Sequence, residues 1–465
     1  MARGERSLRD DALCIWRAGV AAVAPERLLA EAIRVDAPRS LAIQTTRGDS
    51  VEIDLTRLGR LLVVGGGKAG AGMARGIEAA FAPLGLGAER LTGLLSVPAD
   101  CVDASTERIE LVAGRPPGVN EPRPEGARAA QRMLELAAAA GPDDVVVCLL
   151  SGGGSALLPA PSEGVTLADK VAVAKRLAAA GADIGQLNTV RQHLSRFKGG
   201  GLLRACNAGR LVTLVLSDVL GDPLDLIASG PTVAPRTTPR DALEVLDGLG
   251  LTSESDLAAV VAALRSAERP GARSRVAVRT RSDTLVLANN ATAVDAAGVE
   301  AERLGYSHAM HCAGASEGAA EEVGRSLAAM ALRMREANRQ AEPDCLITGG
   351  EPTVELAPPE VRGRGGRNQQ LALAALEELG GCESIALVSG GTDGEDGPTD
   401  AAGAVVDAEV ARRLAGADLS DALRRNDAYP LFDSADALLR TGPTHTNVCD
   451  LRVVTVDRGM PRTTA

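Results

Sequence analysis

The sequence predicts an α/β fold of two domains, each an α/β/α sandwich with a mostly parallel sheet. Three observations lead to this prediction. The chain has 465 residues, which is too long for one ordinary domain. Apolar residues make up 45% of it but aromatic residues only 1%, so the core must be aliphatic, as it is where helices pack on a sheet. Short β-branched apolar runs also alternate with alanine-rich helical stretches, which is typical of a sheet covered on both faces.

The elements of the first domain follow from this alternation. Residues 7–35 place apolar positions at helical spacing, and residues 127–139 and 167–180 do the same further along the chain. The apolar runs expected as buried strands are residues 61–64, 145–150 and 211–216. Because strands and helices alternate, we expect a Rossmann-like sheet of parallel strands.

A domain boundary is expected near residue 270. Residues 234–240 read as a loop, a helix pair is expected within residues 241–266, and the polar segment 269–274 follows. The predicted domains are therefore residues 1–270 and 271–465. The strand candidates of the second domain are residues 275–278, 284–288, 345–348, 385–388 and 451–456.

Composition narrows the class of protein. The formal charge of −11 argues against nucleic acid as a partner. The eight cysteines are scattered, without a CxxC pair, which predicts reduced, buried thiols in a cytoplasmic protein. No stretch is apolar and long enough for a signal peptide or a transmembrane helix, so we expect no membrane partner. The oligomeric state stays open, a homodimer included.

Lysine is rare in this chain. Of the 50 basic residues, only Lys68, Lys170, Lys175 and Lys198 are lysines. Lys68 and Lys198 lie in glycine-rich segments, which favours a functional role. Lys170 and Lys175 lie in an amphipathic helical pattern and are expected to be solvated.

Four strand candidates end in glycine clusters. Glycine permits positive φ and a close approach of backbone amides to a ligand. At the carboxyl end of a parallel strand, the next helix also offers free N–H groups to an anion. One cluster could be a tight turn, but four on one chain favour phosphate binding. The clusters are residues 65–70, 151–155, 349–351 and 389–394.

The first cluster has a GxGxxG spacing, the pattern of dinucleotide-binding folds. We do not expect a dinucleotide, because that fold needs an acidic residue about 20 positions on, at the end of a second strand, and Glu89 precedes the next apolar run instead of ending it. The cluster is not a Walker A loop either, because Ala69 follows Lys68. A lysine in this loop is a point charge suited to phosphate.

Polar residues follow the strand candidate at 211–216. Asp218 emerges at its end, where functional side chains usually lie in this architecture, as a base or a metal ligand. Ser217 is either functional or a turn cap, and Asp222 is either functional or a turn residue.

Residues 188–200 mix polar, basic and glycine residues. Asn188 and Arg191 share a helical face, and Lys198 precedes two glycines. The segment is either a solvated helix with a glycine cap or a site for a substrate anion.

Two segments of the second domain carry charge near glycines. The arginines at 362–367 precede a helix, against the usual preference for acidic first turns, which favours an anion nearby. Residues 392–397 resemble the start of an EF-hand loop, but Ala404 stands where the last glutamate belongs. This excludes calcium and leaves Mg²⁺ or substrate hydroxyls as the ligand.

In their order along the chain, these blocks resemble the class II glycerate kinases, which carry a MOFRL-type C-terminal region, here about residues 343–456. The resemblance covers roughly residues 8–456. The blocks that carry it are residues 65–70, 151–155, 188–200, 217–232, 349–353, 365–370, 392–403 and 441–450.

The resemblance implies phosphorylation of (R)-glycerate by ATP with Mg²⁺, giving 2-phosphoglycerate, and we expect the site in a cleft between the domains. An NAD(P)H-dependent hydroxypyruvate reductase is the alternative, and a non-catalytic nucleotide sensor is a third option. The residues implied as catalytic are Lys68, Asp218 and Arg367, with Asp218 also as a Mg²⁺ ligand. The residues implied in nucleotide or substrate binding are Gly66, Gly67, Ser151, Gly152, Gly153, Gly154, Ser155, Asn188, Arg191, Lys198, Ser217, Gly221, Asp222, Gly350, Glu351, Thr353, Asn368, Asp393 and Asn447.

One position departs from the family. Arg115 stands in a Gly-Arg-Pro-Pro segment where the resemblance leads us to expect histidine. Such a replacement would either alter substrate positioning or be neutral.

Overall fold

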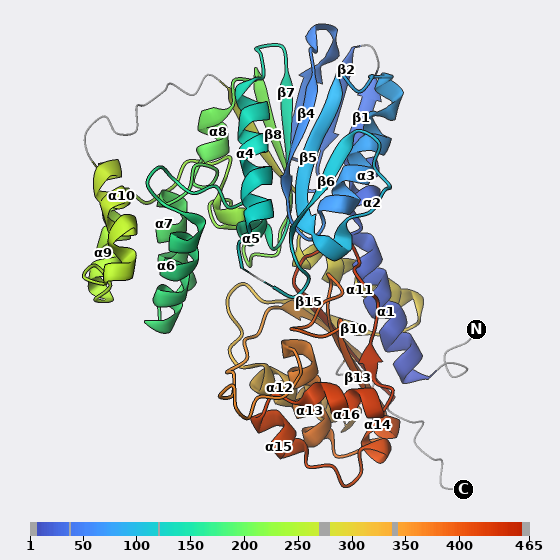
Figure 1. Ribbon diagram of the computed structural model, residues 1–465. Coiled ribbons are helices and arrows are strands. Elements are labelled where there is room, and N and C mark those ends of the chain that lie inside the picture. The colour runs from blue at the N-terminus through green and yellow to red at the C-terminus, as the bar shows by residue number, and fades with distance from the viewer. Residues whose placement is uncertain (1–6, 37–38, 120, 269–279, 337–342, 458–465) are drawn as a thin grey trace, which may run out of the picture. The chain divides into compact units, whose positions relative to one another are not determined.

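The computed structural model describes residues 7–36, 39–119, 121–268, 280–336 and 343–457. The chain divides into two compact units (Figure 1). The N-terminal unit is Pro25–Leu287, and the C-terminal unit joins Met1–Ala24 to Ala288–Ala465. The expected boundary at residue 270 and the strand candidate at 275–278 lie outside the described residues.

The N-terminal unit is built on a six-stranded sheet with the order β6-β5-β4-β7-β8-β9. From β6 to β8 the neighbouring strands are parallel, which confirms the predicted fold class. Chain order reverses between β4 and β7, as in doubly wound nucleotide-binding sheets. The strands are β4 Leu61–Gly66, β5 Leu91–Pro98, β6 Ile109–Arg115, β7 Val145–Leu150, β8 Arg210–Leu216 and β9 Arg281–Ala288.

Helices cover this sheet because its central strands are apolar on both faces. Every residue of β4 is buried. Leu62, Val64 and Val146 pack with Ala130 and Met133 of α4 on one side. The helices around the sheet are α2 Pro25–Ala32, α3 Gly70–Phe81, α4 Pro124–Ala138, α5 Gly154–Leu157 and α8 Gly201–Ala205.

Four more helices form a separate cluster beside the sheet (Figure 1). They share an aliphatic core that includes Val173, Val190, Leu246 and Val260. Three of them begin with a capping box, in which a Thr or Asp side chain and the residue three positions later satisfy each other's amides. The predicted helices at 167–180 and within 241–266 are confirmed here. The helices are α6 Leu167–Ala179, α7 Ile184–His193, α9 Pro239–Gly248 and α10 Ala258–Glu268.

A small antiparallel sheet was not predicted. It consists of β1 Ile33–Asp36, β2 Ser40–Gln44 and β3 Ser50–Asp54. In its second and third strands, buried residues alternate with more exposed ones, which is the pattern of a sheet with one solvent-exposed face. The helical expectation for residues 7–35 is therefore wrong at its end.

The C-terminal unit is built on a mixed sheet with the order β10-β11-β15-β12-β13-β14. Only β10 and β11 pair in parallel. β15 lies between β11 and β12 and runs antiparallel to both, so this sheet is not mostly parallel as expected. The strands are β10 His308–Cys312, β11 Cys345–Gly350, β12 Ile385–Gly391, β13 Gly403–Val406, β14 Leu438–Leu439 and β15 Asp450–Val456.

Helices cover both faces of this second sheet. Aliphatic side chains of α12 and α13 pack against one face, and those of α1 and α11 pack against the other. The helices are α1 Leu8–Ala22, α11 Asn290–Arg303, α12 Ala320–Glu336, α13 Arg367–Leu379, α14 Ala408–Arg413, α15 Leu419–Arg424 and α16 Ala428–Ser434.

Helix α1 belongs to the C-terminal unit, which differs from the predicted domain of residues 1–270. Its Trp16 is buried and donates from Nε1 to the Leu451 carbonyl at 3.0 Å. Tyr306 donates to Asp11 at 2.9 Å. The apolar face of α1 thus completes the core formed with α11 and β15, a long-range contact that sequence order alone does not reveal.

Candidate active site

The first two glycine clusters pack against each other at the carboxyl ends of β4 and β7. The Lys68 amide donates to the Gly152 carbonyl at 2.8 Å, and the Ala69 amide donates to Ser151 Oγ at 3.0 Å. Gly67 has a φ of +147°, and a Cβ there would lie 2.1 Å from Ser151 Oγ. Only glycine fits this contact. The two clusters therefore form one surface at the point where chain order reverses, where ligands bind in such sheets.

The amides of the two clusters differ in availability. Those of residues 67–70 all donate to protein oxygens, so the predicted cradle of free amides does not hold for the first cluster. Among the described residues, the amides of Gly152 and Gly153 find no acceptor. Helix α5, which follows, is a single turn, and its dipole adds little. Anion binding here would depend on the second cluster and on side-chain cations.

Lys68 runs alongside the second cluster. It is half-buried, and a Cβ at Gly153, which has a φ of +77°, would lie 3.4 Å from Lys68 Cγ. A side chain at position 153 would be strained by its backbone and would crowd the lysine. Because position 153 is glycine, the Lys68 side chain can pack against the loop without a steric clash.

A chain of hydrogen bonds joins several of the predicted binding residues. Lys198 Nζ donates to both the carbonyl and the hydroxyl oxygen of Ser155, each at 2.7 Å. The Ser155 hydroxyl lies 3.1 Å from that of Ser229, which donates to Asn188 Oδ1 at 3.1 Å. The structure thus joins Ser155 to Asn188 and Lys198 of the 188–200 segment, with Ser229 of a third segment as the bridge to Asn188.

Ser229 was not singled out by residue type, and a strained turn places it. Ala228, Ser229 and Gly230 have successive φ values of 48°, 62° and 61°. Each of the two non-glycine residues in this left-handed region lowers the stability of the fold by roughly 1–3 kcal/mol, and such backbone strain is concentrated at functional sites. The only signal in the sequence was the Ala-Ser-Gly-Pro-Thr block of the family resemblance.

Three cations gather around this network. Lys198 is buried, and Lys170 is buried and donates to the Leu194 carbonyl at 2.9 Å. Burial, and then the charge of Arg191, lower the pKa of Lys170 to about 7. Burial, with Lys170 and Arg191, lowers the pKa of Lys198 well below its ordinary value, and burial lowers that of Arg191. No carboxylate of the described residues pairs with these three side chains, so an anionic ligand would relieve their repulsion.

The expectation that Lys170 is solvated is wrong. Its ammonium bonds to Leu194 at the end of α7, and of the two lysines of α6 only Lys175 lies at the surface, where it pairs with Glu121 at 2.9 Å. The amphipathic pattern predicted the helix correctly, but it could not predict which of its polar side chains other segments would cover.

The buried charge of Lys170 gives the fold a pH dependence. The folded-state pKa lies near 7 and the ordinary value is 10.5. Between these values the unfolded chain holds the proton and the folded protein does not, so stability rises with pH, and the full cost is present below about pH 7. Lys170→Met should therefore raise the unfolding free energy by roughly 1–3 kcal/mol at pH 6, after loss of the bond to Leu194.

Urea denaturation of both proteins at pH 6 and pH 9.5 measures this effect. The gain should shrink at the higher pH. Lys175→Met, at the exposed lysine of the same helix, is the control and should show no such trend. An equal difference at both pH values would contradict a buried, titrating lysine.

The segment after β8 is ordered by turns. Ser217 Oγ accepts from the Val219 amide at 3.3 Å, so its turn-cap alternative is supported. Asp222 has a φ of 53° and pairs with Arg47 at 3.0 Å, which agrees with its turn alternative. Asp218 is half-buried at the strand end, as expected.

The C-terminal unit holds the third residue expected to be catalytic. Arg367 is the first residue of α13, and its Nε and Nη2 donate to the two carboxylate oxygens of Asp450 at 2.7 and 2.9 Å. Its Nη1 pairs with Glu351 at 2.8 Å. Burial opposes the charged form, but Asp450 and Glu351 outweigh it and raise the pKa of Arg367 above its ordinary value.

The anion expected beside this helix N-terminus is supplied by the protein. Asp396 accepts from the amides of Asn368 and Gln369, each at 2.9 Å. Burial raises the pKa of Asp396 to about 7, although these bonds oppose it. The arginine-rich approach therefore pairs with internal carboxylates, and it is not by itself a sign of a bound ligand.

Other residues expected to bind ligand in this unit have structural partners. Asn368 accepts from Ser389 at 2.6 Å, Thr353 donates to the Gly318 carbonyl at 3.1 Å, and Asp393 accepts from the Glu395 amide at 3.0 Å. A Cβ at Gly350 would lie 2.0 Å from Glu317 Oε2. Close packing thus accounts for that glycine.

A buried ion pair in the same unit was missed. Arg452 is 1% exposed and donates to both oxygens of Glu317 at 2.8 Å. It lies within an apolar strand, where nothing in the local pattern marks it as paired.

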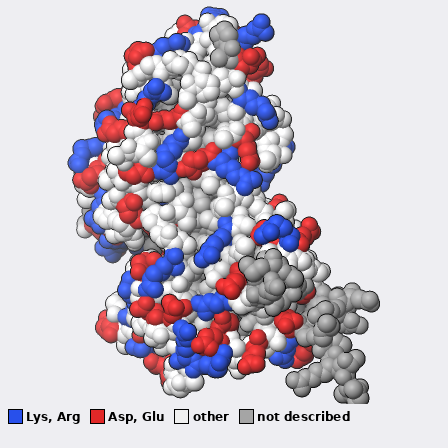
Figure 2. Space-filling model, turned by 90° about the vertical axis from the view of Figure 1, so that its right-hand side faces the viewer, with Lys and Arg blue, Asp and Glu red and all other residues white. Residues whose placement is uncertain are grey.

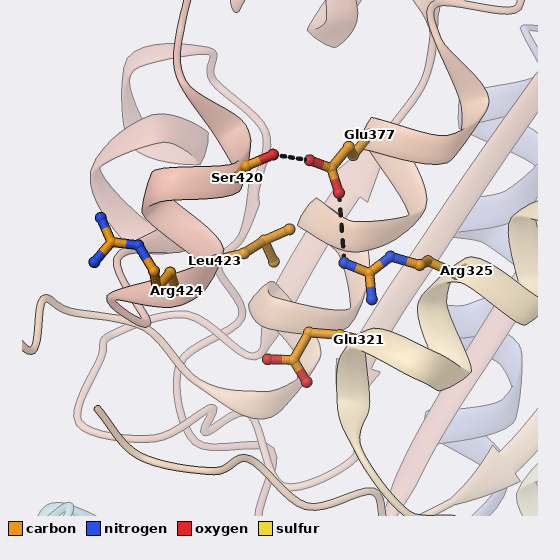
Figure 3. A pocket seen from close by; sticks show the side chains of 6 residues that line it. All are labelled: Glu321, Arg325, Glu377, Ser420, Leu423 and Arg424. Atoms are coloured by element: carbon orange, nitrogen blue, oxygen red, sulfur yellow. Dashed lines mark hydrogen bonds and ion pairs between the residues drawn. The ribbon is translucent and has the colours of Figure 1, made fainter. Parts of the chain in front are cut away.

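A shallow hollow between α12, α13 and α15 holds none of these residues (Figure 3). Arg325 pairs there with Glu377 at 3.5 Å, and Ser420 donates to Glu377. Arg325, Glu377 and Ser420 thus satisfy one another, while Glu321 and Arg424 have partners outside the hollow, so it carries no argument for a ligand.

The described residues set limits on metal and membrane binding. Within them, no three His, Cys, Asp or Glu side chains are arranged to hold a metal ion. Over the same ranges, no helix is long and apolar enough to cross a membrane. All eight cysteines are free thiols and five are buried, largely as predicted. On the face shown in Figure 2, acidic and basic side chains are interspersed.

Family models match both parts of the chain. Residues 11–265 match a family described as "Domain of unknown function (DUF4147)", and residues 344–450 match the MOFRL family. The second match lies within the region predicted at about 343–456.

Curated relatives carry two different names. A "Putative hydroxypyruvate reductase" of Agrobacterium vitis is 40% identical, over 86% of this chain and 87% of its own. The "Glycerate kinase" of Bos taurus is 36% identical, over 96% and 92%, and that of Homo sapiens is 34% identical, over 96% and 93%. The crystal structure of glycerate kinase from Thermotoga maritima is 33% identical and superposes with a TM-score of 0.76, covering 97% of this chain and 99% of that one.

Proposed function

Because the chain belongs to the glycerate kinase family, in which a DUF4147 region is joined to a MOFRL region, we propose that it transfers the γ-phosphoryl group of ATP to the 2-hydroxyl of (R)-glycerate. The observation that carries this proposal is the group formed by two buried lysines, Lys170 and Lys198, and the half-buried Arg191, in which Lys198 bonds to Ser155 of the second glycine cluster. They have no carboxylate partner among the described residues. A phosphate chain supplies the negative charge that such a set lacks.

Cations and free amides suit phosphoryl transfer. The reaction needs positioning and neutralisation of charge more than a nucleophile from the protein. Lys198 and Arg191 hold phosphates of ATP next to the free amides of Gly152 and Gly153. Lys68, which runs alongside the same loop, neutralises charge on the group in transfer.

Asp218 takes the proton of the attacking hydroxyl. As the bond forms between the 2-oxygen of glycerate and the γ-phosphorus, the bond to the β-phosphate oxygen breaks and ADP leaves. The hydroxyl proton passes to the Asp218 carboxylate, which lies at the end of β8, as a general base does in this architecture.

Mg²⁺ fits the donors of this site. Proteins usually hold Mg²⁺ by one or two carboxylates together with substrate phosphates. A single half-buried carboxylate, Asp218, is therefore sufficient, and a three-carboxylate cluster is not required. When bound, Mg²⁺ would neutralise charge on the β- and γ-phosphates.

Arg367 is the proposed catalytic cation of the C-terminal unit. Asp450 fixes two nitrogens of its guanidinium, and Nη1 pairs with Glu351, whose side chain is 43% exposed. An exposed pair of this kind is weak, so Nη1 is the nitrogen that an anionic ligand would contact.

Two assays test the proposal. The protein is incubated with ATP, Mg²⁺ and (R)-glycerate, ADP is measured, and phosphorus NMR distinguishes 2- from 3-phosphoglycerate. In parallel, NADH is added with hydroxypyruvate. NADH oxidation without ADP formation in the first assay would reject the kinase in favour of the reductase.

A further inference from the structure

A buried arginine close to Lys68 has no role in the site described so far. Arg115 is the last residue of β6 and is 4% exposed. Its Nη1 donates to the carbonyls of Pro116 and Val119 at 3.2 and 3.0 Å. Its Nε is buried and has no hydrogen-bond partner among the described residues. A buried donor without an acceptor costs about 1–3 kcal/mol, and more when it is charged.

The guanidinium of Arg115 is directed toward the second glycine cluster. A Cβ at Gly153 would lie 3.4 Å from Arg115 Nη2 and 3.4 Å from Lys68 Cγ. Basic side chains from two different strand ends therefore approach the same glycine, whose amide is also without an acceptor among the described residues. This arrangement points to an oxyanion held at Gly153.

We propose that Arg115 binds the carboxylate of the hydroxy-acid substrate and thereby selects acids that carry the hydroxyl on the neighbouring carbon. This inference rests on the proposed glycerate kinase function. A guanidinium offers a planar fork that matches a carboxylate, whereas the lysine ammonium is a point charge suited to the phosphoryl group. In a 2-hydroxy acid the two groups are on neighbouring carbons, and two basic side chains that approach a single residue suit that short spacing.

The test compares glycerate with glyceramide, its neutral amide, as phosphoryl acceptors. Arg115→Met should raise the KM for glycerate about 10- to 100-fold, the loss expected for a hydrogen bond to a charged group. The kinetics with glyceramide and the KM for ATP should be unchanged, so selectivity for the acid should fall by the same factor. Arg115→Lys keeps the positive charge but not the planar guanidinium, so it should recover part of the lost selectivity for the acid.

Arg90→Met is the matched control. Arg90 also donates to two backbone carbonyls, those of Gly59 and Leu58, but it precedes β5, at the opposite end of the strands. The Arg90→Met variant should leave the selectivity for glycerate over glyceramide unchanged, even if it lowers Tm as much as Arg115→Met does.

Three results would overturn the assignment. An equal loss with glycerate and glyceramide would make Arg115 structural, a higher KM for ATP alone would make it a nucleotide contact, and unchanged selectivity would remove it from the site. A wild-type protein that forms no ADP would reject the proposed function. Calorimetric titration of glycerate into wild type and Arg115→Lys would then still decide whether Arg115 binds the carboxylate.

Discussion

Lys68→Ala should lower kcat by about 10²- to 10³-fold, because it removes a cation that stabilises developing charge in the site. The loop itself should persist, since the bond from the residue 68 amide to the Gly152 carbonyl involves only the main chain. Steady-state ADP formation measures the loss, and the thermal midpoint checks the fold.

The control for this substitution is Lys175→Ala. It removes the same side chain from the surface of α6, where its partner is Glu121. Turnover should remain at the wild-type level. If Lys68→Ala turns over as fast as this control, Lys68 has no part in the chemistry.

Arg367→Ala should lower the unfolding free energy by about 3–5 kcal/mol, the usual cost of breaking one side of a buried ion pair. Asp450 is fully buried, and burial raises its pKa while Arg367 lowers it to a net value below the ordinary one. Without Arg367 the carboxyl would favour its neutral form, so the loss should be smaller at pH 5 than at pH 8. Urea denaturation at the two pH values measures this difference.

Two further variants test whether Arg367 acts in catalysis as well as in holding the fold. Arg325→Ala breaks the half-exposed pair with Glu377 in the same unit and should cost at most about 1 kcal/mol. The double variant Arg367→Met with Asp450→Leu should recover much of the stability, but not turnover. Recovery of turnover would mean that Arg367 acts only by holding the fold.

Local patterns predicted the parts of the fold that depend on local physics. Strands β4 and β7 are short, apolar and followed by glycine, so they and the clusters after them could be identified, whereas β5 and β6 were not predicted. Ser155 and Lys198 were selected because they lie in glycine-rich segments, and the structure joins them at 2.7 Å.

The failures involve contacts between segments distant in sequence. The helical pattern around Lys170 gives no sign that the end of α7 covers that face. The arginine loop before α13 could not reveal that Asp396 and Asp450, much later in the chain, already supply the anions. The mixed sheet depends on where β15 inserts, and a strand's own residues do not specify its neighbours.

The position of β15 has a consequence for synthesis of the protein. This strand lies near the end of the chain, yet it pairs with both β11 and β12, and α1 from the beginning packs on it. Until β15 has been synthesised, Trp16 and the inner edges of β11 and β12 lack it as their partner. They then expose surfaces that are prone to aggregation. The N-terminal unit is contiguous at Pro25–Leu287 and can fold during translation, whereas the C-terminal unit must wait for release of the last strand.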